Sequence, residues 1–496
     1  MAVTGRIDGV PSDIWHEEVL APQFAYEAEH LLGHYLAIEK VLLLEYVRMG
    51  LVDAAGAAGI AARLDSLTPD AVRADPEDNM SDISFAVERH VMSGPVPPFH
   101  AWHVDRSRND LQVCAQMMSA RENLTAVAAG LVSLGRAVTS LAARYADVPM
   151  PGYTHAQAAQ IVSPGFYLGA LAAETTATLR RLLHTYDEAD ACPLGSGTMA
   201  GQELAWDRAR MAGLLGFSRV QPHALVAVAS RGWALAIAGD LAHYAVALSR
   251  FTTDLMAWGG SGFGFLELPD DLSGISAAMP QKRNFPVLER IRGRCAQVAG
   301  CAADLAAGQR NTAYTNTVEV SKEAGGQLRT QFDAMRSVLR LTRAVVGGAV
   351  FSADRMREAC AEEYLGGFTL ANRLTLDYGV PWRTAQVISG RYVKRALEKG
   401  LRPAEADATL LAALCAQEGY EAEGTGALLA VAFDVDEGLR AKRSAGSAHP
   451  DEVRAALVGQ EGELTRLAGE WSLRARRSTD AARRQDDLLA AAERRS

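Results

Sequence analysis

The sequence predicts an all-α protein built around a bundle of long helices, and composition and proline placement support this fold class. Of the 496 residues, 49% are hydrophobic but only 7% are aromatic, so small and aliphatic side chains must fill the core. That mixture suits packed helices better than sheets, which favour β-branched and aromatic residues. Three long stretches contain no proline, between Pro98 and Pro149, between Pro222 and Pro269, and between Pro286 and Pro381. Because a proline inside a helix costs about 3 kcal/mol, these gaps leave room for long helices.

Two segments inside the gaps, residues 111–146 and 233–258, are rich in Ala and Leu, with polar residues recurring at helical spacing. They carry little charge over long stretches. A helix that is apolar nearly all round is buried on all sides, so we expect these two in a bundle centre or a subunit interface.

A chain of this length exceeds one ordinary core, and we divide it into three helical domains. Residues 1–106 form a smaller N-terminal domain, punctuated by the Gly/Pro run SGPVPPFH. Residues 107–350 form the central long-helix bundle. Residues 351–496 form a C-terminal domain that closes with the charged tail RARRSTDAARRQDDLLAAAERRS, whose alternating charges predict a solvated helix.

Several classes of function are excluded by composition. The net charge of −9 and the lack of a basic stripe argue against nucleic-acid binding. No uninterrupted apolar run approaches the ~18 residues of a membrane span, and MAVTGRIDGV is no signal peptide, so we expect a cytoplasmic protein that does not contact membranes. The six cysteines are scattered, without C-x-x-C pairs or a His cluster, which favours buried reduced thiols over disulfides or zinc. No Gly-rich dinucleotide or phosphate-binding motif is present.

Four polar islands interrupt the apolar helices, and the first is HVDRSRNDLQ, residues 103–112. Ser107, Asn109 and Asp110 are good N-cap residues directly before a long helix. The N–H groups and dipole of such a helix end favour an anion, and Arg106 and Arg108 add positive charge. Simple helix capping is the other interpretation.

The second and third islands are GYTHAQAAQ, residues 152–160, and PLGSGTMAGQELAWDR, residues 193–208. In the second, His155 follows Thr154, and an imidazole is suited to donating a proton near neutral pH, although a lone histidine is more often structural. The third is a Gly-rich loop that leads to Arg208, and alone it would be a helix connection.

The fourth island is SGISAAMPQKRN, residues 273–284, in which small residues give a mobile backbone before Lys282 and Asn284. Glu289 follows it, and AYTNTVEVSKE at 313–323 adds three more polar residues, Tyr314, Glu319 and Lys322. A surface loop with solvated charge is the alternative reading of this segment.

Taken together, SRND, YTHxQ, PLGxGxxAG…DR, SxxMPQKxN and the later Y…K pair resemble the aspartase/fumarase superfamily, and within it argininosuccinate lyase. The likeness extends from about residue 76 to about residue 400. It implies anti β-elimination of a small dicarboxylate substrate, an N-substituted aspartate, to fumarate and an amine, with neither metal nor organic cofactor. It also implies a homotetramer whose core is the central bundle and whose active sites each combine motifs from three subunits.

The resemblance assigns roles to individual residues. Ser276 would take the proton beside a carboxylate, and Lys282 and Asn284 would hold that carboxylate, where charge develops and fixed donors act most strongly. His155 would protonate the leaving group and Glu289 would orient His155. The remaining expected substrate-binding residues are Ser107, Asn109 and Thr154 for the succinyl part, Arg108, Tyr314, Glu319 and Lys322 for the amine, and Arg208.

The sequence departs from the family mostly at the amine end. Glu319 replaces a glutamine and Met80 a histidine, the acidic S-D-R-D segment becomes Ala-Ser-Arg-Gly at 229–232, and the Trp-Gly-Gly-Arg-Phe arm has no clear counterpart. Ile275, Phe285 and Asp105 are further changes, beside the catalytic serine, after the Lys-x-Asn segment and before the first motif. We therefore expect an amine other than arginine. The alternatives are a true argininosuccinate lyase, a fumarase-like or adenylosuccinate-lyase-like enzyme, and a catalytically silent scaffold like the lens crystallins of this family.

Overall fold

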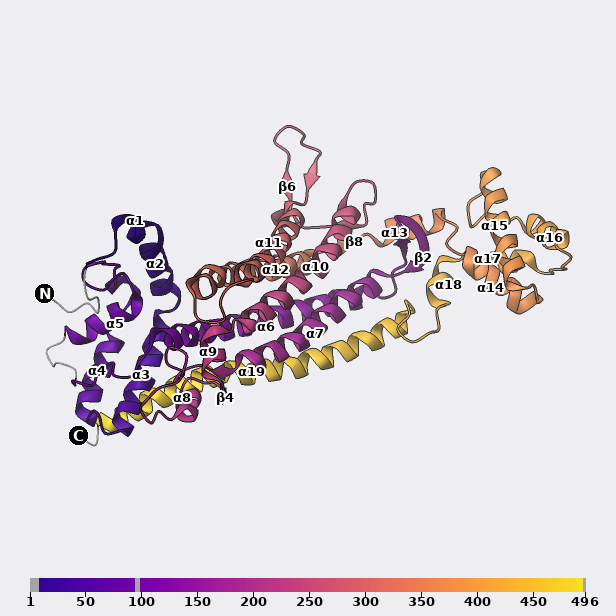
Figure 1. Cartoon of the computed structure of the whole chain (residues 1–496). Helices are drawn as coiled ribbons and strands as arrows, with labels where there is room; N and C mark the ends of the chain where they lie inside the picture. Colours follow the sequence, from indigo (N-terminus) through magenta and orange to yellow (C-terminus); the bar gives the residue numbers. More distant parts are fainter. Residues whose placement is uncertain (1–8, 94–98, 494–496) are drawn as a thin grey trace.

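The computed structural model describes residues 9–93 and 99–493 of the chain. Most of the N-terminal MAVTGRIDGV stretch, the run GPVPP and the last three residues of the tail lie outside the described residues. The molecule is an elongated helical bundle with a group of shorter helices at either end (Figure 1). The predicted all-α class is confirmed, because the strands in the described part of the chain are short and form only two-stranded pairs.

The group at the N-terminal end packs its own apolar core, which includes Ile38, Leu64 and Val87. The first turns of the long helix that follows contribute to this core through Val113 and Met117. The elements of this group are α1 (Asp13–Trp15), the π-helix η1 (His16–Leu20), α2 (Ala21–His30), α3 (Leu32–Arg48), α4 (Ala54–Asp65), the 3-10 turn η2 (Pro69–Ala71) and α5 (Ile83–Met92).

Six long helices form the bundle and share one core, which includes Leu131, Leu241, Val298 and Phe332. They are α6 (Arg108–Arg144), α7 (Pro164–Ala189), α10 (Gly232–Gly259), α11 (Pro286–Gln309), α12 (Ala324–Gly348) and α19 (Pro450–Glu493). Both helices expected from the proline gaps are confirmed as α6 and α10. In the described chain α6 is the one helix long and apolar enough to cross a membrane, but it packs on α7, α12 and α19 as the core helix of a bundle does.

The last helix, α19, corrects the expectation of a solvated tail in the C-terminal domain. It runs back along the whole bundle to the N-terminal helices (Figure 1). Leu464 and Trp471 are buried in the bundle core, and Leu489 is buried in the N-terminal core. Apolar residues recur at helical spacing on the inner face of α19, while most of the tail's charges lie on its outer face. The domain boundaries near residues 106 and 350 stay predictions.

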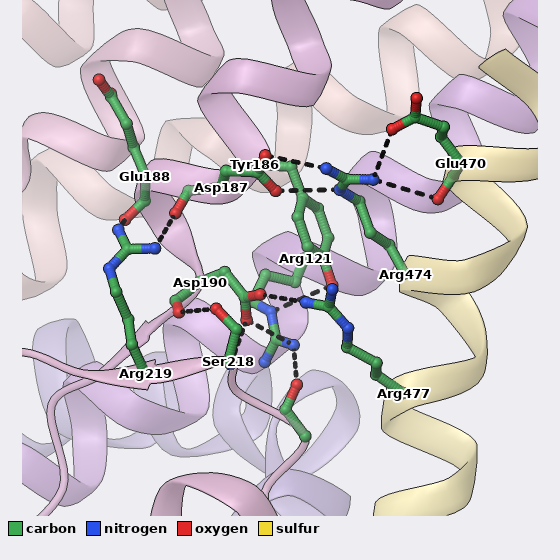
Figure 2. A network of polar contacts seen from close by, with 11 residues as sticks. Arg121, Tyr186, Asp187, Glu188, Asp190, Ser218, Arg219, Glu470, Arg474 and Arg477 are labelled. Carbon is green, nitrogen blue, oxygen red and sulfur yellow. Dashed lines mark hydrogen bonds and ion pairs between the residues drawn. The ribbon is translucent and has the colours of Figure 1, made fainter.

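Part of the charge of α19 is used to fasten it to the bundle (Figure 2). Arg477 pairs with the buried Asp190 at 2.7 Å, and Arg121 of α6 pairs with the other oxygen of the same carboxylate at 2.9 Å. One turn earlier, Arg474 pairs with Asp187 at 2.8 Å. Two basic residues of the tail, Arg474 and Arg477, are therefore ion-pair partners of carboxylates at the C-terminal end of α7.

Short elements connect the long helices. They are β1 (Met150–Thr154), β2 (Gln157–Val162), β3 (Ala191–Cys192), α8 (Arg208–Leu214), β4 (Arg219–Val220), α9 (Ala224–Ala229), β5 (Leu266–Glu267), η3 (Asp270–Leu272), β6 (Gly274–Ile275), β7 (Arg283–Asn284), η4 (Glu319–Glu323) and β8 (Val350–Phe351). The strand pairs are β1–β2, β5–β8 and β6–β7, all antiparallel, and the parallel β3–β4.

The group at the other end of the bundle has a separate core that includes Leu374, Ile388 and Leu429. Its helices are α13 (Ala353–Glu362), α14 (Gly367–Tyr378), α15 (Trp382–Glu398), α16 (Ala408–Gln417), α17 (Thr425–Ala432) and α18 (Val435–Arg440). All six cysteines of the chain are buried and free, as the sequence predicts.

Candidate active site

The start of α6 and the Gly-rich loop at 193–201 form one connected unit. Ser107 caps α6 by accepting a hydrogen bond from the N–H of Asn109 at 3.2 Å. The side-chain amide of Asn109 donates to the carbonyl of Thr198 at 3.1 Å. The Thr198 hydroxyl in turn lies 3.4 Å from the Ser107 hydroxyl. The first and third sequence motifs, which are more than 80 residues apart, therefore meet at one helix end.

Asp110, in the first turn of the same helix, also holds the Gly-rich loop. Its Oδ2 accepts hydrogen bonds from the N–H groups of Gly195 at 2.9 Å and Gly197 at 3.0 Å. Complete burial raises the pKa of this carboxyl to about 7, although both N–H groups act in the opposite direction. Gly197 has φ +60°, and a Cβ there would lie 2.5 Å from the carbonyl oxygen of Gly201, so this turn requires glycine.

Arg208 supports the Gly-rich loop from its far side. Its Nε donates to the carbonyl of Leu194 at 3.0 Å, and its Nη2 donates to the Ser196 hydroxyl at 2.9 Å and the Gln221 carbonyl at 3.1 Å. Burial lowers the pKa of this guanidinium. The donors of Arg208 are used to hold the loop, and its predicted substrate contact stays a prediction.

Arg106 and Asp105, at the start of the first polar island, both have partners within the chain. Arg106 is not available to an anion, because its side chain is buried and pairs with Glu39. Asp105 adds no free charge to the helix end. With φ +58° it turns toward the segment after the Gly-rich loop, where its carboxylate accepts from the N–H of Leu204 at 2.8 Å and from the indole of Trp206 at 2.9 Å. Burial raises the pKa of Asp105, but these donors outweigh it and hold the pKa below its ordinary value.

Lys322 lines a cavity of about 350 Å³ bounded by α2, α6, α10, η4 and α12, and Arg108 lies on α6 one turn before Gln112 of the cavity wall. Arg108 pairs with Asp82 at 2.8 Å. Lys322 lines the cavity and lies 3.6 Å from the carboxylate of Glu27. Burial raises the pKa of Glu27, although the positive charge of Lys322 acts in the opposite direction. Gln116, two turns after Arg108 on the same face of α6, donates to the Ser321 carbonyl at 2.7 Å. Glu27 was not among the predicted residues, since an acidic residue on an amphipathic helix gives no distinguishing signal.

Tyr314 and Glu319 lie on the segment that leads to Lys322 and are both exposed. The Glu319 N–H and the neighbouring Thr317 hydroxyl hold the pKa of the Glu319 carboxyl below its ordinary value. A charged acceptor is thus presented to solvent one helical turn from Lys322.

Thr154 and His155 lie on a tight turn at the far end of α6. Thr154 pairs with Gln157 across the β1–β2 hairpin, and the two residues between them have φ +52° at His155 and φ +60° at Ala156. Two-residue hairpin turns with positive φ normally use Gly, Asn or Asp, so this turn carries strain at an exposed histidine. Strain of this kind concentrates at functional sites, which supports the role expected for His155.

Ser276 lies on the β6–β7 hairpin, which projects from the bundle between α10 and α11 (Figure 1). The Ser276 hydroxyl accepts from the N–H of Met279 at 3.1 Å, and Ile275 beside it is 92% exposed. Arg283 fastens the base of the hairpin through Asp270 at 2.9 Å and Ser273 at 3.2 Å. A fixed base and an exposed tip suit a segment that closes over a ligand.

The remaining residues of this group follow on the same segment. Lys282 and Glu289 are exposed and Asn284 is half-buried. Asn284 pairs with Gly274 within the hairpin, and Glu289 lies in the first turn of α11. The sequence motif therefore places a hydroxyl, an ammonium and an amide on the projecting hairpin, and the Glu289 carboxylate at the start of the bundle helix that follows it.

Within one chain the predicted residues fall into three separate groups. Ser107, Arg108, Asn109, Arg208 and Lys322 lie near the start of α6, and Thr154 and His155 lie beyond its end. At about 1.5 Å per residue, the 37 residues of α6 span about 55 Å, which no small substrate bridges. The third group, on the β6–β7 hairpin, projects away from both (Figure 1).

The comparisons with known proteins agree with the motifs. A family described as lyase matches residues 73–300. Argininosuccinate lyase from Desulforudis audaxviator is 32% identical over 430 residues, which are 85% of this chain and 90% of that protein. The same enzyme from Methanothermobacter thermautotrophicus is 30% identical over 82% of this chain and 87% of that protein.

Among solved structures, a variant of EDDS lyase with bound fumarate superposes with a TM-score of 0.83, at 21% identity, over 100% of this chain and 99% of that one. A fumarate lyase from Mesorhizobium superposes with a TM-score of 0.70, at 17% identity, over 89% and 98%. Fold and sequence thus point to the same group of enzymes. The chain belongs to the aspartase/fumarase superfamily, as a divergent relative of the argininosuccinate lyases.

Proposed function

We propose that this protein is a carbon–nitrogen lyase that eliminates an amine from an N-substituted aspartate and releases fumarate. One observation supports this most strongly: Ser276, Lys282 and Asn284 share a projecting hairpin, in a chain 32% identical to an argininosuccinate lyase. A base with an ammonium and an amide beside it suits proton removal next to a carboxylate.

In the proposed reaction, Ser276 takes the proton from the carbon beside the carboxylate. The electron pair delocalises into that carboxylate, whose second negative charge Lys282 and Asn284 stabilise. The pair then forms the carbon–carbon double bond of fumarate as the carbon–nitrogen bond breaks. His155, oriented by Glu289, gives a proton to the departing amine. No metal or organic cofactor takes part in the proposed steps.

The proposed active unit is a homotetramer, with the long helices at its centre. Each site would combine the Ser107 group of one chain, the His155 group of a second and the Ser276 group of a third. The proposal is supported by the separation of about 55 Å along α6 between the first two groups. The exposure of His155, Lys282 and Glu289 in the single chain also fits side chains that await a neighbouring subunit.

The amine would occupy the cavity lined by Lys322, with Arg108 one turn from its wall on α6 and with Ser107, Asn109 and Thr154 on the succinyl part. Glu319 would favour a cationic group on that amine, and we expect the amine to differ from arginine. If Glu319→Gln left the preference among substrates unchanged, this role of Glu319 would be dropped.

The test is fumarate release by the purified protein from argininosuccinate and from a panel of other N-substituted aspartates, with Ser276→Ala as the matched control. Release from a panel member but not from argininosuccinate is the expected result. Robust Ser276-dependent release from argininosuccinate would instead support a true argininosuccinate lyase, which the 32% identity favours as the second candidate. Silence of a folded tetramer across the panel would contradict the proposal and favour a scaffold.

A further inference from the structure

The strained turn at His155 needs support from other parts of the fold. A backbone with φ +52° at His155 and φ +60° at Ala156 persists only where the surrounding structure holds it. Residues 154–157 are all exposed, so within the described chain little packs on the turn itself. The support must therefore reach the turn through the two arms of the hairpin, β1 and β2.

These arms lie where the bundle meets the C-terminal group of helices (Figure 1). There α13 packs on β1 and α18 packs on β2. Ile161 of β2 is 5% exposed and forms a small separate core with Cys360 of α13 and Leu439 of α18. Two hydrogen bonds from Arg357 of α13 to the carboxylate of Asp436 of α18, at 3.0 and 2.8 Å, tie the two helices together. The tied pair of helices forms one support for the hairpin.

The support and the hairpin are in close contact at Gly438 of α18. A Cβ at this position would lie 2.6 Å from Cδ1 of Ile161, whereas ordinary contacts of a Cβ are 3.4–4 Å. Gly438 and Ile161 are both buried, and a close-packed interior leaves little room for adjustment. A single methyl group added at Gly438 must therefore push Ile161 and β2 away from α18, by about 1 Å.

A shift at Ile161 reaches the turn through β2. Ile161 is four residues from Gln157, where the turn ends, which is about 13 Å along a strand at about 3.3 Å per residue. Because β2 is paired with β1 from Val162 to Gln157, the two arms move together. The position of α18 is thus transmitted to His155.

We propose that Gly438 and Ile161 are positioning residues, through which the C-terminal group of helices sets where His155 lies in the active site. Both act through the turn, and neither contacts the substrate. The inference rests on the proposed function, in which His155 protonates the leaving amine. It gives the C-terminal group a part in the reaction, although none of the proposed site residues belongs to that group.

Two changes of one carbon each test the proposal, measured as kcat for fumarate release from the substrate that the wild-type protein cleaves. Gly438→Ala should lower kcat about 10-fold or more, because misplacing a reacting group by about 1 Å can cost about 100-fold. Ile161→Val removes Cδ1, the atom that the new methyl group would meet. The double variant keeps the buried volume, so its kcat should return to within about threefold of wild type. Gly390→Ala in α15 is the matched control, because a Cβ there has no atom within 4 Å, and it should leave kcat unchanged.

The His155→Asn background separates positioning from general damage. Once the imidazole is gone, Gly438→Ala should lower kcat by about threefold or less, because both changes act on the same group. Ile161→Ala removes the contact from the other side and should show the same dependence on His155, so it tests the proposal even if Gly438→Ala does not fold. An equal loss with and without His155, or a loss that Ile161→Val does not restore, would overturn the proposal.

Hydrogen exchange of the paired amides in residues 150–162 gives a measurement that needs no activity. Gly438→Ala should speed this exchange about 10-fold or more, and Ile161→Val should reverse the effect. If the wild type releases fumarate and Gly438→Ala changes neither kcat nor exchange, this inference is wrong and the proposed function stands. If a folded tetramer never releases fumarate, the proposed function is wrong, and the exchange rates alone decide whether α18 holds the turn.

Discussion

Replacing Asp110 with asparagine tests whether the Gly-rich loop is fixed by a buried carboxyl that titrates near neutral pH. In the structure Asp110 bridges the N–H groups of Gly195 and Gly197, and an asparagine oxygen can accept the same two bonds. The substitution therefore keeps the loop contacts and removes only the titration.

The magnitude follows from the shift of the Asp110 pKa from its ordinary 3.8 to about 7. Because the pKa is higher in the folded state, protonation of Asp110 stabilises the folded protein. This stabilisation is complete below pH ~4 and is lost as the pH rises toward ~7. With these two values, Asp110 destabilises the wild-type protein by about 2.5 kcal/mol between pH 5 and pH 8. Asp110→Asn should be free of this loss.

The assay is urea denaturation of both proteins at pH 5 and pH 8, at one protein concentration. The free energy of unfolding of the wild type should fall about 2.5 kcal/mol more than that of Asp110→Asn over this interval. Asp105→Asn is the matched control. The pKa of Asp105 lies below its ordinary value, so this carboxyl stays ionised between pH 5 and pH 8. A difference between wild type and Asp110→Asn that is the same at both pH values would refute the reasoning.

Two further substitutions test other parts of the structure. His155→Asn should keep the hairpin, since asparagine tolerates φ +52°, but should lower fumarate release about 100-fold or more in a continuous absorbance assay, and an unchanged rate would remove His155 from the mechanism. Arg121→Met should destabilise the protein by about 3 kcal/mol in urea, because Asp190 would stay buried with only Arg477 as its charged partner, and a loss below about 1 kcal/mol would show that Arg477 alone suffices.

The long helices and the caps were predictable because their signals are local. Proline gaps and apolar periodicity located α6 and α10, and Ser107 caps α6 as its type and position suggest. The motifs also placed Ser276 and His155 on segments whose backbone suits a functional role, a projecting hairpin and a strained turn.

Features that depend on distant partners were not predictable. The charges of the tail gave a solvated helix, because Asp190, the partner of Arg477, lies nearly 300 residues away in sequence. Leu464 and Trp471, which pack in the bundle core, lie before the charged tail, so their apolar spacing was not part of the segment from which a solvated helix was predicted. Arg106 was expected to add charge for an anion, but its buried partner Glu39 lies 67 residues earlier in the sequence.

The most direct test of a site shared between subunits is activity in hybrid tetramers. Asn109→Ala and Ser276→Ala are each expected to be inactive on the substrate that the wild-type protein cleaves. The two variants are unfolded together, refolded and confirmed as mixed tetramers. A site is then intact only when its Asn109 comes from a Ser276→Ala chain and its Ser276 comes from an Asn109→Ala chain. Each of these events has a probability of one half. The account predicts recovery of about one quarter of wild-type fumarate release. No recovery in confirmed mixed tetramers would contradict the shared site.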